Sequence, residues 1–126
     1  MKTPDALEWS EVGSLPPGAK IAVIEGSMAE PEPFTVRLKF PANYELPAHT
    51  HPAVERVTVL SGTFHMGLGA KLDKGEGMGL DPGGIMILQP GVQHYAWTGD
   101  TEVIVQLNGI GPWGITYVNP EDDPRK

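Results

Sequence analysis

Two histidines and a glutamate stand close together in the stretch AHTHPAVERVTVLSG, residues 48–62. His49 and His51 are separated by one residue, and in a strand such residues point to the same face, so both imidazoles can contact one metal ion. Pro52 cannot donate a backbone hydrogen bond to a central strand, which predicts a turn directly after the second histidine. Glu55 then opens the next, neighbouring strand. The pattern predicts a metal site built from two strands and one turn.

A fourth ligand has to come from elsewhere, and the remaining histidines are His65 and His94. His94 follows the turn formed by Pro90 and Gly91 and begins a strand, which is the position that Glu55 has in its own strand. His65 lies within a strand and alternates with apolar residues, which favours an exposed or barrel-wall histidine. We therefore predict His94 as the fourth ligand. Burying such a group without a partner would cost several kcal/mol.

The predicted ligand set is His49, His51, Glu55 and His94. Three neutral imidazoles and one carboxylate bind one divalent transition metal, Mn, Fe, Ni, Co, Cu or Zn, and leave one or two positions free for water or substrate. The chain has no cysteine, which excludes a thiolate zinc site, disulfides and a cysteine nucleophile. An open position on the metal indicates chemistry, and Glu55 is then a candidate catalytic base as well as a ligand.

Some side chains near the predicted ligands have a role that the pattern leaves open. Gln106 could reach into a pocket behind the ligands and hydrogen-bond there, but a glutamine on the outer surface fits the pattern equally well. Tyr95 and Trp97 alternate with His94 and point away from it, which favours sheet packing or an interface. Trp113 and Tyr117 are likewise predicted to pack.

Short strands separated by glycine and proline turns must position these side chains. The predicted strands cover residues 20–26, 33–41, 54–62, 63–69, 84–90, 92–99, 101–109 and 113–118, with a further short strand at HTH. No segment of ten or more residues has a helical period. Residues 70–82 form a glycine-rich loop, for which a surface connection is favoured over a lid. About eight or nine short strands in one domain predict an all-β sandwich or barrel.

Composition excludes several classes of partner. The 126 residues fit one domain, which we divide into an arm (1–18), a β-barrel (19–118) and a polar tail (119–126). The net charge of -7 and the lack of a basic cluster argue against nucleic acid and anionic membranes. No leader or long apolar run is present, so we expect a cytoplasmic protein. A serine nucleophile elbow and a phosphate-binding glycine loop are also missing.

The spacing of the candidate ligands resembles the first sequence motif of the cupin family. That motif has two histidines around one residue, a glutamate after three more residues and a glycine after a further six. His49, His51, Glu55 and Gly62 match it in full. The glycine that leads the motif is Asn43 here, a residue that also tolerates left-handed backbone conformations.

The second cupin motif is matched in part. Gly83, Gly91 and His94 stand at the expected positions. The sequence departs from the motif at Gln89, where a proline is expected, and at Thr98, where an asparagine is frequent. These departures affect the local turn, whereas the histidine ligand is retained.

The resemblance, which extends over most of the chain, implies a small bacterial single-domain cupin of the RmlC-like type. The implied fold is a double-stranded β-helix, or jelly roll, with the metal inside one mouth. The implied function is a metal-dependent enzyme of dioxygenase, isomerase or lyase type that acts on a small oxygenated molecule. A non-catalytic metal- or ligand-sensing module is the alternative, and a homodimer is expected because jelly rolls of this size commonly pair.

Overall fold

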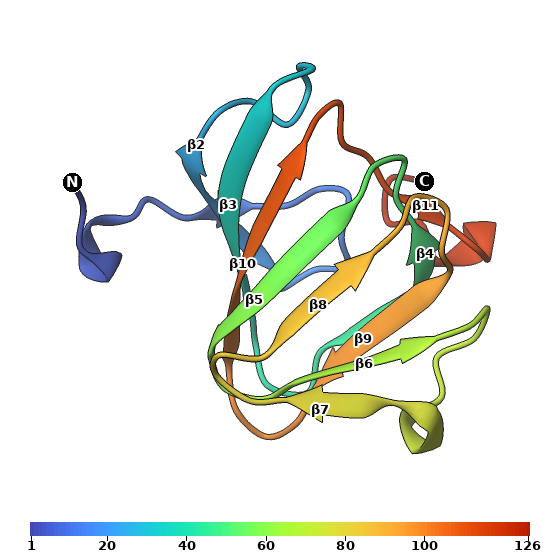
Figure 1. The fold of residues 1–126 in the computed structure, drawn as a ribbon. Helices are drawn as coiled ribbons and strands as arrows, with labels where there is room; N and C mark the ends of the chain where they lie inside the picture. The colour runs from blue at the N-terminus through green and yellow to red at the C-terminus, as the bar shows by residue number, and fades with distance from the viewer.

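The computed structural model describes residues 1–126 and contains two antiparallel β-sheets (Figure 1). The six-stranded sheet consists, in spatial order, of β1 (Ser10–Glu11), β2 (Lys20–Glu25), β3 (Pro33–Phe40), β10 (Val103–Ile110), β5 (Glu55–Ser61) and β8 (Ile85–Leu88). The five-stranded sheet consists of β11 (Thr116–Tyr117), β4 (Glu45–Thr50), β9 (His94–Thr98), β6 (Phe64–Leu68) and β7 (Met78–Leu80). Three short 3-10 turns complete the chain: η1 (Pro4–Ala6), η2 (Lys74–Glu76) and η3 (Pro120–Asp122). The predicted all-β jelly-roll fold is confirmed.

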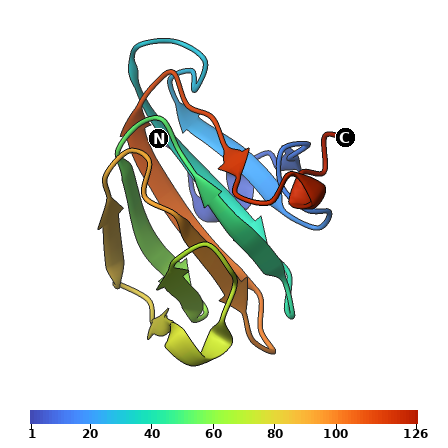
Figure 2. The same cartoon turned by 90° about the vertical axis from the view of Figure 1, so that its right-hand side faces the viewer.

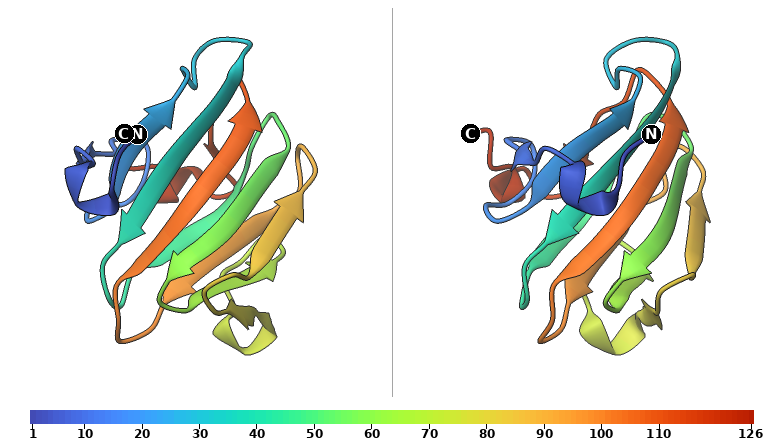
Figure 3. Two further views of the ribbon diagram at one scale, coloured as in Figure 1. Left: turned by 60° about the vertical axis from the view of Figure 1, so that its left-hand side comes forward. Right: turned by 90° about the vertical axis from the view of Figure 1, so that its left-hand side faces the viewer.

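The larger sheet turns one face toward the core, as the alternation of its sequence predicts. Figure 3 (left) shows β2 (blue), β3 (teal), β10 (orange), β5 (green) and β8 (yellow-orange) side by side. Phe34 and Val36 of β3 and Val105 and Leu107 of β10 are almost completely buried. Each such side chain stabilises the fold by roughly 1.5–3 kcal/mol relative to an exposed one. Strand alternation therefore fixes which residues face the second sheet.

Two tight turns need backbone conformations that most residues avoid. Asn43 has a φ of 57° in the connection that leads into β4, in agreement with its predicted tolerance of that region. Gly62 has a φ of 75°, and a Cβ atom at this position would lie 2.4 Å from the carbonyl oxygen of Glu102. For this reason only glycine fits at position 62, directly after β5.

The segment predicted as a loop at 70–82 is more ordered than expected, because it contains η2 and the short strand β7. It covers the outer face of the smaller sheet. The Tyr95 hydroxyl donates to the carbonyl oxygen of Asp73 at 2.8 Å, and Gly77 lies close against the Trp97 ring. His65 stacks on the same indole, with ring centroids 5.0 Å apart. The prediction that the two aromatic residues of β9 pack away from His94 is confirmed.

The C-terminal segment packs against the segment that precedes β2, whereas the N-terminus lies on the opposite side of the molecule (Figure 1). Figure 2 shows the C-terminal segment beside the blue segment that precedes β2. The Tyr117 hydroxyl donates to the carbonyl oxygen of Ser14 at 2.6 Å, and Leu15 is buried in the core. The Lys39 ammonium lies 4.2 Å from the centre of the Trp9 ring. The longest helical elements are single 3-10 turns, and no helix could cross a membrane.

Candidate metal centre

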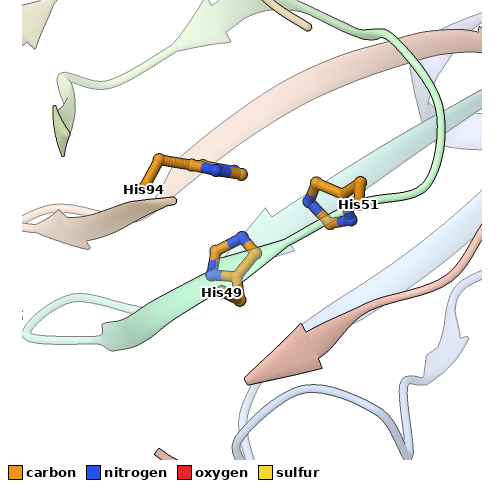
Figure 4. A group of neighbouring side chains, drawn as sticks. All are labelled: His49, His51 and His94. Carbon is orange, nitrogen blue, oxygen red and sulfur yellow. The ribbon is translucent and has the colours of Figure 1, made fainter. Parts of the chain in front are cut away.

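All four predicted ligand side chains meet in the space between the two sheets. Strands β4 and β9 pair so that His49 lies directly opposite His94, and His51 follows the end of β4 by one residue. Figure 4 shows these three imidazoles converging from two segments. Glu55 is the first residue of β5 and comes from the facing sheet. Here the sequence interpretation needs correction, since it placed Glu55 on a neighbouring strand.

The group is compact and almost free of solvent. Ligand atoms from His49, His51 and His94 lie within 4.8 Å of one another, and the exposed fractions of these three residues are 2%, 9% and 2%. Glu55 is 8% exposed. Its Oε2 atom lies 3.3 Å from His51 Nε2, and its Oε1 atom lies 3.1 Å from His94 Nε2. One carboxylate therefore reaches two of the three imidazoles.

Each histidine is oriented by a backbone carbonyl next to its Nδ1 atom. The acceptors are Pro47 O for His49 at 2.7 Å, Gly114 O for His51 at 2.7 Å and Val92 O for His94 at 2.9 Å. A carbonyl accepts but never donates, so each Nδ1 carries the proton. In the neutral ring the Nε2 atom then has the free lone pair. Three such lone pairs are directed at the same space as the carboxylate.

Two buried atoms of the group have no hydrogen-bond partner, namely Glu55 Oε1 and His94 Nε2. With a neutral imidazole both atoms carry lone pairs, and their contact is an ion pair only if the ring takes up a second proton. An unpaired buried polar atom costs about 1–3 kcal/mol. A divalent cation would satisfy both atoms and the other two Nε2 atoms together, so the residues fit a transition metal.

Charge states within the group also suit a cation. Burial, reinforced by the neighbouring His94 and His51, lowers the pKa of the His49 imidazole to about 3. Burial by itself raises the pKa of the Glu55 carboxyl, but the adjacent His51 and His94 outweigh burial and lower this pKa to about 2. A neutral imidazole and an ionised carboxylate are the forms that bind metals.

A cavity of about 360 Å³ opens beside the group and is lined in part by His49, His51 and Glu55. Its remaining wall is mainly apolar and includes Leu15, Ile21, Leu38, Leu46, Trp113 and Ile115. This volume lies at the lower end of the range for small-molecule sites. A small ligand could therefore reach the ligand atoms of the candidate metal centre.

Trp113 is a site residue that the sequence interpretation assigned to packing alone. Its indole stacks on the His51 ring, with centroids 4.3 Å apart and an angle of 23° between the planes. It also packs edge-on against Phe34, at 5.6 Å between centroids. Nothing in the local sequence signals this contact, because it depends on how the segment after β10 folds back over the end of β4.

Gln106 does not join the site. Its Oε1 atom accepts a hydrogen bond from Arg37 Nε at 3.1 Å, whereas the adjacent Val105 and Leu107 are buried in the core. Because successive side chains alternate between the two faces of a strand, the glutamine points to the outer face of the sheet. The expectation of a pocket role for Gln106 is therefore corrected in favour of the outer-surface alternative.

The two sheets and the buried ligand group define a cupin, as the sequence resemblance predicted. The chain belongs to the family described as ChrR cupin-like domain, which matches residues 1–107. No curated protein matches the chain significantly.

Solved structures share the fold over nearly the whole chain. The polyketide cyclase RemF from Streptomyces resistomycificus is 16% identical with a TM-score of 0.79, and the alignment covers 99% of this chain and 89% of that one. KdgF from Halomonas sp. is 21% identical with a TM-score of 0.67, covering 86% and 93%. The DMSP lyase DddQ from Ruegeria pomeroyi is 17% identical with a TM-score of 0.64, covering 85% and 57%. At these identities the similarity shows the common fold.

Proposed function

We propose that the protein is a metal-dependent enzyme that acts on a small oxygenated molecule. The observation that carries this proposal is the pair of unpartnered buried atoms, Glu55 Oε1 and His94 Nε2, in a group next to a cavity that Glu55 lines and that is large enough for a small molecule. His49, His51, Glu55 and His94 would hold one divalent transition metal, Mn, Fe, Ni, Co, Cu or Zn. When bound, such an ion acts as a Lewis acid or a redox centre.

The protein residues have separate tasks in this proposal. The three backbone carbonyls keep the imidazoles in one tautomer and one orientation. Glu55 lines the cavity as well as contacting two histidines, so its carboxylate can accept a proton from a molecule held there. Apolar walls exclude water from that molecule. These tasks suit lyase, isomerase or dioxygenase chemistry, and the names of the RemF and DddQ structures describe a cyclase and a lyase on the same fold.

Metal analysis gives the first test. Protein purified without an affinity tag should contain about one equivalent of a transition metal by mass spectrometry, since four converging ligands form one site. A protein that stays metal-free after incubation with Mn, Fe, Ni, Co, Cu and Zn in turn would contradict the proposal.

Glu55→Gln tests the catalytic role of the carboxylate. The amide is nearly isosteric but cannot accept a proton, so we expect turnover to fall by about 100-fold or more while the protein remains folded. If the variant kept both metal and full turnover, the dual role of Glu55 would be wrong. Binding without any conversion in the wild type would instead favour a metal- or ligand-sensing module.

A homodimer remains part of the proposal. Four apolar side chains near the free edges of the two sheets are more than half exposed: Leu68, Met78, Ile85 and Ile87. Strand edges that carry apolar residues are commonly covered by another chain. Light scattering should give the mass of two chains, and a monomeric mass would contradict this expectation.

A further inference from the structure

The cavity beside the candidate metal centre has a strongly uneven distribution of polar groups. Ten of its sixteen lining residues are hydrophobic. Its buried polar side chains are His49, His51 and Glu55, which all belong to the candidate metal centre. The half-buried Ser14 also lines the cavity. A molecule that fills the cavity therefore meets its buried polar partners at the candidate metal centre and apolar surface over most of the remaining wall.

One charged side chain, Arg125, also lines the cavity, but its guanidinium is already engaged. Its Nε atom donates to Asp123 Oδ1 at 2.9 Å, and its Nη2 atom donates to the carbonyl oxygen of Ile115 at 2.9 Å. The Arg125 side chain is 45% exposed. Because Asp123 neutralises the guanidinium and water reaches it, Arg125 offers little to a second anionic group on a ligand.

Trp113 supplies a flat apolar part of the cavity wall next to His51. Its ring is fixed from both sides, by the stack on His51 and by the edge contact with Phe34. Its backbone N–H donates to the carbonyl oxygen of Met28 at 2.7 Å, which holds the segment in place. An apolar group of a ligand that binds next to His51 would therefore contact a preformed aromatic surface.

We propose that this cavity takes molecules with one oxygen-bearing chelating end and an apolar body, and that it discriminates against polyhydroxylated molecules such as sugar acids. Since a bound metal would have to hold the oxygens, this substrate class rests on the proposed function. Ser14 is the only hydroxyl side chain in the wall. Most hydroxyl groups along the body of a ligand would therefore lose water without finding a partner, whereas methylene groups would gain from burial.

The test uses hydroxamates, because this head group chelates divalent metals through two oxygens. Acetohydroxamate, butanoyl hydroxamate, hexanoyl hydroxamate and gluconohydroxamate are titrated into the zinc-loaded wild-type protein by calorimetry. Burial of one methylene group is worth about 0.8 kcal/mol, or about fourfold in affinity. We expect the affinity to rise by about that factor per methylene group until the cavity is filled, and gluconohydroxamate to bind at least tenfold more weakly than hexanoyl hydroxamate.

Two variants locate the effect. Ile115→Asn places an amide in the cavity wall and should reduce the gain from butanoyl to hexanoyl hydroxamate by about tenfold. Ile110→Asn is the matched control, because Ile110 is 59% exposed and does not line this cavity, and it should leave the series unchanged. The series on the wild-type protein decides the matter even if Ile115→Asn fails to fold.

The outcomes separate this inference from the proposed function. If acetohydroxamate binds the zinc-loaded protein but affinity does not rise with chain length, or if gluconohydroxamate binds as tightly as hexanoyl hydroxamate, the apolar substrate class is wrong and the metal site stands. If the protein takes up no metal, the proposed function fails first, and the inference fails with it.

Discussion

The two faces of the sheet formed by β4 and β9 are both buried but differ in how their polar atoms are satisfied. On the outer face, Tyr95 and Trp97 lie under the segment that contains η2, and the tyrosine hydroxyl has a backbone acceptor. On the inner face, His94 Nε2 has no hydrogen-bond partner, and neither has Glu55 Oε1, which approaches it from the facing sheet. Since buried polar atoms are nearly always paired, the outer face is a packing surface and the inner face is the candidate binding site. The packing surface and the candidate binding site thus lie on opposite sides of β9.

Removal of a ligand from the inner face should have the largest effect. His94→Ala deletes one of four converging ligands, so we expect the metal affinity to fall by at least about 100-fold, as loss of supporting groups alone costs 10- to 100-fold. Competition with a chromophoric chelator measures this loss. His65→Ala is the matched control, because His65 stacks on Trp97 at the outer face. An equal loss in both variants would contradict the division between the two faces.

Removal of the large aromatic side chain from the outer face should act on stability instead. Trp97→Ala leaves a cavity under Gly77 and His65, which should lower the free energy of unfolding by about 3–5 kcal/mol. Urea unfolding followed by circular dichroism measures this change. The folded fraction should keep its full metal content, and loss of metal in step with stability would show that the two faces are coupled.

Metal removal should have a smaller effect on stability than loss of the tryptophan. A metal that binds only the folded chain stabilises it by about 2.7 kcal/mol at a free concentration 100 times the Kd. Dialysis against a chelator should lower the Tm, and addition of metal should restore it. In His94→Ala this response should disappear, whereas in Trp97→Ala it should be retained from a lower starting Tm.

The smallest expected effect is the loss of one satisfied hydrogen bond on the outer face. Tyr95→Phe removes the donor to Asp73 O and should lower the free energy of unfolding by about 0.5–1.5 kcal/mol, without a change in metal affinity. Chemical denaturation and the chelator assay on the same preparation measure both quantities. A clear change in metal affinity would indicate that the covering segment also positions β9.

Most of the strands and the four candidate ligands could be predicted because they depend on short-range patterns, whereas β1 and the first residues of β4 lie outside the predicted strands. Alternation of apolar residues predicted the buried faces of β3 and β10, and spacing predicted that His49 and His51 share a face. His94 was found from its position after a proline-glycine turn. The first two inferences use the two-residue period of a strand, and the third uses the sequence preference of a turn; the sequence displays both directly.

Other features could not be predicted because they depend on contacts between distant segments. The alternation of residues along the strand did not decide whether Gln106 points into the barrel or outward. The register of β10 against β3 places it opposite Arg37, with which it forms a hydrogen bond. The loop at 70–82 lacked a strand signal, and β7 forms only because β6 lies beside it.

The sequence by itself determined which side chains can bind a metal, since residue type and spacing along a strand are properties of the chain. Only the tertiary structure decided what surrounds them. Because the two sheets face each other, Glu55 contacts His51 and His94. Because the segment after β10 folds back over the end of β4, Trp113 stacks on His51. Those contacts join residues far apart in the chain, so they arise from the packing of the whole domain and leave no local pattern.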